Sequence, residues 1–135
     1  MYNKINAAEV QSKIPPGIAA SKLNREEVFI TTKIPCDHWD GGVEPMNASM
    51  AEYYISADLS QLNTSYIDLM LLHHPGMPND CWGYPVVDKW PCPDSLRSGN
   101  RAATADEWRE SWRALEVALQ RGMVRAIGLS DFRSE

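Results

Sequence analysis

Residues 66–75 read Tyr-Ile-Asp-Leu-Met-Leu-Leu-His-His-Pro, a short apolar run that ends in two histidines and a proline. An apolar run bounded by polar residues and proline is typical of a buried parallel strand. In parallel α/β proteins, functional side chains lie where the strands end on their carboxyl side. His73 is therefore a candidate site residue, and the alternative is a histidine that only caps the strand.

The patterns on either side of this run predict two further strands separated by helices. Residues 28–34 are β-branched and aromatic, and residues 124–129 form another short apolar run. Apolar residues at three- and four-residue steps predict a helix from about 47 to 62. A second helix is expected after the capping box that begins at Thr104. The alternation of strands and helices predicts an α/β fold with a parallel sheet.

Two consecutive prolines interrupt the helical pattern in the amino-terminal part of the chain. Residues 6–14 fit a short helix, which Pro15-Pro16 is expected to end because proline cannot continue a helix. A second helical piece is predicted over residues 18–23.

The composition is that of one soluble domain. The chain has 135 residues, of which 44% are hydrophobic and 23% charged, and its net charge is −5. This balance argues against a nucleic-acid or anionic membrane surface, and no apolar run approaches the roughly 20 residues that span a bilayer. Three cysteines without CxxC spacing, and no apolar leader, predict free thiols in a cytoplasmic protein and no metal site. A Cys81–Cys92 disulfide, or a zinc site with His73 or His74, is the alternative.

Two features leave a choice open. Lys33 ends the strand predicted at 28–34, where a lysine either faces a cleft or packs its stem and extends its ammonium to solvent. Residues 76–103 break the regular pattern with prolines, glycines and aromatic side chains. A loop this long is usually functional or disordered. We predict an active-site-type loop, whose aromatic residues either cover a substrate or pack the loop onto the domain.

Three strand ends, read together, resemble the aldo-keto reductases. They are Phe-Ile-Thr-Thr-Lys at 29–33, the run at 66–75, and Gly-Met-Val-Arg-Ala-Ile-Gly-Leu-Ser-Asp-Phe at 122–132. The resemblance covers roughly residues 24–132. It implies strands three to five of a (β/α)8 TIM barrel and an oxidoreductase that uses NADPH, or NADH, to reduce an aldehyde or ketone to an alcohol.

The resemblance implies catalytic roles for three residues. Lys33 and His73 match the catalytic lysine and histidine of the family, and Tyr2 is the candidate for its tyrosine. The tyrosine would donate a proton to the carbonyl oxygen while the ammonium lowers its pKa. The histidine would orient the carbonyl through a hydrogen bond.

Further residues are implied to bind ligands. Ser130 and Asp131 match the pair that holds the nicotinamide carboxamide, and His74 stands where many members have a pocket tryptophan. Asp131 departs from the family asparagine, because a carboxylate only accepts hydrogen bonds. Trp82 in the long loop is a further candidate for the substrate pocket.

The length of the chain predicts a partial domain. A barrel of this kind takes about 250 residues, so residues 1–135 are expected to supply one part of it. The aspartate that partners the lysine and the loops that grip the cofactor phosphates are not found in the sequence. The alternative is a non-catalytic interaction module derived from such a half-barrel, and its unpaired strand edges would favour self-association.

Overall fold

The computed structural model describes residues 11–34, 47–73, 104–130 and 132. Strands and helices alternate along the chain in the predicted order, and the strands are shorter than the apolar runs that predicted them. The elements are α2 (Ile14–Ser21), the 3-10 helix η1 (Arg25–Glu27), β1 (Thr31–Ile34), α3 (Ala48–Gln61), β2 (Leu69–Leu72), α4 (Ala105–Gln120) and β3 (Ile127–Leu129).

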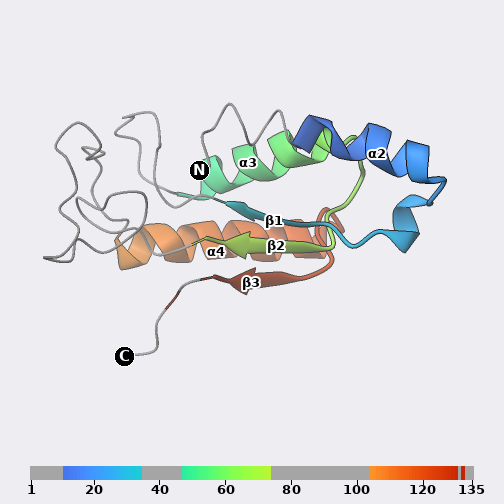
Figure 1. Cartoon of the computed structure of the whole chain (residues 1–135). Helices are drawn as coiled ribbons and strands as arrows, with labels where there is room; N and C mark the ends of the chain where they lie inside the picture. The colour runs from blue at the N-terminus through green and yellow to red at the C-terminus, as the bar shows by residue number, and fades with distance from the viewer. Residues whose placement is uncertain (1–10, 35–46, 74–103, 131, 133–135) are drawn as a thin grey trace, which may run out of the picture.

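The strands form one parallel sheet in the order β1-β2-β3, and their arrowheads all point the same way in Figure 1. Thr31 pairs with Leu69 in the first ladder, and Met70 pairs with Ile127 in the second. A parallel pair needs a crossover connection, which α3 and α4 supply. The α/β class predicted from the sequence is therefore confirmed.

The sheet buries the face that packs against α3 and α4. Ile34, Met70 and Leu72 are 0% exposed, and they meet Ile55 of α3 and Leu115 of α4 in the core. Because side chains alternate across a strand, Lys33 lies on the other face of the sheet, where it is exposed.

The starts of the two long helices follow from their capping residues. The Asn47 side chain accepts a hydrogen bond from the Met50 amide at 3.1 Å at the start of α3. Thr104 and Glu107 form the predicted capping box at the start of α4. These bonds satisfy amide groups that have no partner within the first turn of a helix.

The two prolines near the amino terminus lie inside a helix, which corrects the sequence prediction. The helix α2 begins at Ile14, with proline in its first turn, rather than at residue 18. Proline is tolerated there because the amide it lacks has no intrahelical acceptor. Within the described part of the chain, no helix combines the length and apolar character needed to cross a membrane.

Candidate active site

Three predicted site residues stand at the carboxyl ends of adjacent strands. Lys33 is near the end of β1, His73 directly follows β2, and Ser130 directly follows β3. The His73 amide donates to the Ile34 carbonyl at 3.0 Å, and the Ser130 amide donates to the Leu72 carbonyl at 2.8 Å. The ladder of backbone hydrogen bonds therefore continues past the ends of β2 and β3. It holds Lys33, His73 and Ser130 together at the carboxyl end of the sheet.

The Lys33 and Ser130 side chains are in direct contact. Lys33 Nζ donates a hydrogen bond to Ser130 Oγ at 2.9 Å. Lys33 belongs to β1 and Ser130 follows β3, so the lysine stem extends past the end of β2, across a span of roughly two strand spacings of about 4.8 Å each. Both side chains and that of His73 fall on the sheet face that α3 and α4 leave uncovered, by the alternation of each strand.

Within the described residues, Lys33 and Ser130 can make hydrogen bonds beyond the one that joins them. A serine hydroxyl that accepts a bond keeps its own proton to donate, for example to an amide oxygen such as a nicotinamide carboxamide. The Lys33 ammonium has three protons, and its only described partner is Ser130. An ammonium so placed favours negative charge on an acidic hydroxyl within about 4–6 Å. The donor set therefore fits both a carboxamide and a proton-donating phenol.

Gly128 lies one residue before the end of β3, close to these site residues, and was not identified from the sequence. It pairs with Leu71, which pairs in turn with Lys33, so the three form one row across the sheet. A Cβ at Gly128 would stand 2.8 Å from Leu71 Cδ2. A glycine inside a strand pattern is a signal of such close approach.

Several predicted features lie outside the described residues. They are the candidate residues Tyr2, His74, Trp82 and Asp131, the cysteines and the loop at 76–103. Their places at the site stay predictions. Among the described residues, no group of three or more histidine, cysteine, aspartate or glutamate side chains is arranged to hold a metal ion.

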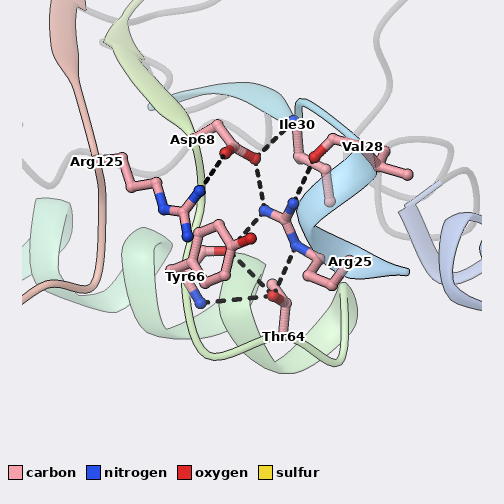
Figure 2. Close-up of polar contacts among 7 residues, drawn as sticks. All are labelled: Arg25, Val28, Ile30, Thr64, Tyr66, Asp68 and Arg125. Atoms are coloured by element: carbon pink, nitrogen blue, oxygen red, sulfur yellow. Dashed lines mark hydrogen bonds and ion pairs between the residues drawn. The ribbon is translucent and has the colours of Figure 1, made fainter. Parts of the chain in front are cut away.

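A partly buried ion pair joins the opposite, amino ends of the strands (Figure 2). Arg25 Nη2 lies 2.6 Å from Asp68 Oδ2, and the two side chains are only 18% and 7% exposed. The same carboxylate oxygen accepts the Ile30 amide at 2.9 Å, and Arg25 also donates to the carbonyl of Val28. Burial alone would raise the pKa of Asp68, but the Ile30 amide and Arg25 outweigh it and hold that pKa below its usual value.

Tyr66 completes this cluster as an aromatic contact for two arginines. The guanidinium carbon of Arg25 lies 4.1 Å from the Tyr66 ring centroid, and that of Arg125 lies 3.7 Å from it. Arg125 Nη1 also approaches Asp68 Oδ1 at 3.5 Å. Arg25, Asp68 and Arg125 come from the segments ahead of β1, β2 and β3, so the cluster fastens the strands together. The cluster lies at the end of the sheet away from Lys33, His73 and Ser130, so we assign it a role in stability.

Comparisons with known proteins identify the family of this chain. The aldo/keto reductase family model matches residues 2–135, and the chain belongs to that family. It is 31% identical to the NAD(P)H-dependent D-xylose reductase I,II of Candida tropicalis, over 94% of this chain and 36% of that protein. It is also 31% identical to aldo-keto reductase family 1 member A1 of Bos taurus, over 96% of this chain and 35% of that protein.

The solved aldose reductase of Schistosoma japonicum has the same fold over this region. The TM-score is 0.64 at 23% identity, and the match covers 96% of this chain and 38% of that one. The chain thus spans about a third of the length of the curated relatives it matches, as the length predicted. Its sheet is the three-stranded part of the barrel that the resemblance implied.

Proposed function

We propose that the chain forms part of a carbonyl reductase that uses NADPH to convert a small aldehyde or ketone into an alcohol. The observation that carries this proposal is the contact between Lys33 and Ser130 at the carboxyl end of the sheet, where His73 also lies. The relatives named above as reductases support it. We also expect a cytoplasmic protein.

Each candidate residue of this chain has a separate role in the proposed reaction. A bound nicotinamide would supply the hydride. Ser130, with Asp131, is proposed to hold its carboxamide, and His73 to orient the carbonyl of the substrate. Lys33 is proposed to stabilise the phenolate of the proton donor, for which Tyr2 is the candidate. His74 and Trp82 are the proposed walls of the substrate pocket.

Titration of the purified chain with NADPH, followed by nicotinamide fluorescence, tests this function. We expect saturable binding that Ser130→Ala weakens about two- to tenfold, because one hydrogen bond is lost. Ser56→Ala is the matched control, since Ser56 is an exposed residue of α3. Absence of binding at high concentration would contradict the reductase function for this chain.

A second function, as an interaction module, is favoured by the open sheet. Within the described residues, the outer edges of β1 and β3 are unpaired, and Phe29 just before β1 is 71% exposed. Unpaired edges are templates for pairing with another chain. A second copy of the chain would then pair with one of these unpaired edge strands.

Self-association is measured by size-exclusion chromatography with light scattering, over a range of protein concentrations. We expect a dimer or larger species that Phe29→Asp weakens, since the change places a charge beside the open edge. Tyr53→Asp is the control, because Tyr53 is 60% exposed on α3, away from the strands. A stable monomer at every concentration would rule out this second function.

A further inference from the structure

Asp58 is a buried carboxyl group that takes no part in the candidate site. It lies on α3 and is 7% exposed. Thr32 Oγ1 of β1 donates to Asp58 Oδ2 at 3.0 Å. Gln11 Nε2 donates to Asp58 Oδ1 at 3.1 Å and to Thr32 Oγ1 at 3.2 Å. The three side chains close a triangle of hydrogen bonds between α3, β1 and the segment ahead of α2.

The triangle joins the Asp58 carboxyl group to two neutral partners. Gln11 Nε2 donates to Asp58 and to Thr32, and the Thr32 hydroxyl donates to Asp58, so each carboxyl oxygen has one partner in the triangle. A neutral carboxyl group keeps this connection, because its carbonyl oxygen can accept the Gln11 amide and its own proton can be donated to the Thr32 oxygen. Ionisation instead leaves a charge buried among neutral donors.

The described surroundings of Asp58 supply no compensating cation. On the amino-terminal segment, Lys13 is exposed, and on β1, Lys33 lies on the opposite face from Thr32. On α3 itself, the titratable neighbour one turn earlier is the half-buried Tyr54. Asp58 makes no ion pair with any described residue. A buried charge without a partner costs free energy that hydration would recover.

The amino-terminal segment provides part of the cover over Asp58. Gln11 contacts the carboxyl directly, and Ile14 and Ile18 of α2 pack against the core. If residues 11–21 move away, water reaches the carboxyl group and its ionised form is hydrated. Docking of this segment and the charge state of Asp58 are therefore coupled.

We propose that Asp58 is a protonation-sensitive latch, in which the neutral carboxyl group holds residues 11–21 on α3 and β1 and the ionised group favours their release.

The direction of the pH effect follows from the docked geometry. Burial raises the pKa of Asp58 in the docked state above 3.8, and the bonds from Thr32 and Gln11 offset only part of that rise. The docked state therefore holds the proton more tightly than the open state, in which the carboxyl group is hydrated. Docking is strongest at a pH below the ordinary pKa and weakens as the pH rises to the raised value, by up to tenfold per pH unit for one proton.

Hydrogen–deuterium exchange of the peptide covering residues 11–21 measures this coupling in the intact chain. Rates are corrected for the intrinsic effect of pH, over a range that begins near 3.8 and extends to neutrality. We expect protection of this peptide to fall as the pH rises. Asp58→Asn should abolish that dependence, while Asp106→Asn, at a side chain 89% exposed, should leave it unchanged.

A second variant tests the latch without altering the carboxyl group. Thr32→Val keeps a β-branched residue in β1 and removes a donor that favours the ionised form. The pH at which protection falls should therefore move upward. Protection that does not vary with pH in the wild type, an equal dependence in Asp58→Asn, or no movement in Thr32→Val would overturn the proposal.

Discussion

Asp68→Ala is expected to lower the free energy of unfolding by about 3 kcal/mol, the lower end of the range for a buried ion pair, because Asp68 is buried and Arg25 is only partly buried. The Arg25 side chain, only 18% exposed, would keep its charge and lose the carboxylate 2.6 Å away. The Ile30 amide would also lose its acceptor. Because Arg125 approaches the same carboxylate, the change loosens the amino ends of all three strands. Urea denaturation followed by circular dichroism measures the loss.

The control for this prediction is a second aspartate paired with an arginine. Asp106 contacts Arg109 at 3.0 Å, but both side chains are more than half exposed, at 89% and 54%. Asp106→Ala should cost no more than about 1 kcal/mol, since water screens an exposed pair. Similar losses in the two variants would contradict the structural role assigned to Asp68.

The effect of Asp68 on stability should depend on pH. Its pKa is lowered in the folded protein, so its contribution is complete above the ordinary value of 3.8 and disappears as the pH falls through the lowered value. The wild type and Asp68→Ala should therefore converge in stability at acidic pH. Asp58 acts in the opposite direction, because its pKa is raised.

Lys33→Met is expected to reduce turnover of a reactive aldehyde, such as a nitrobenzaldehyde, by about 10²–10⁴-fold at saturating NADPH, the range typical of acid–base catalysis. Methionine keeps the length of the stem and removes the ammonium that the proposed mechanism places beside the proton donor. Stability should change little, because Lys33 is exposed and its described hydrogen bond is to one serine hydroxyl. Turnover rates and thermal melts of the variant give the two readouts.

Lys22→Met is the matched control for Lys33. It removes the same charge from an exposed lysine just after α2, away from the strand ends. Its turnover should equal that of the wild type. Retained activity in Lys33→Met would refute the catalytic role of that lysine.

The arrangement of Lys33, His73 and Ser130 was predictable because it follows from two local patterns. Each residue ends an apolar run, and parallel strands bring their carboxyl ends to one edge of a sheet. The bond between Lys33 and Ser130 was not predictable, since the two residues are 97 positions apart and meet only once the ladder sets their register.

The roles of Asp58 and Asp68 were less accessible to sequence reasoning. Asp58 lies on the buried helical stripe, three residues after Ile55 and four before Leu62, where a polar side chain indicates an internal partner. Those partners, Gln11 and Thr32, are 47 and 26 positions away. Asp68 interrupts an apolar strand, and its partner Arg25 is 43 positions away. A local pattern indicates that such a residue needs a partner and does not identify it.

Transfer of deuterium to the alcohol product from NADPH that carries two deuterium atoms at nicotinamide C4 measures the proposed reaction itself. The purified chain would be incubated with the labelled cofactor and a reactive aldehyde, and the product would be analysed by mass spectrometry. A site built from Lys33, His73 and Ser130 predicts one deuterium on the carbinol carbon with the wild type and only the background level with Lys33→Met. An unlabelled product from the wild type, or equal labelling by both proteins, would contradict the assignment of carbonyl reduction to this site.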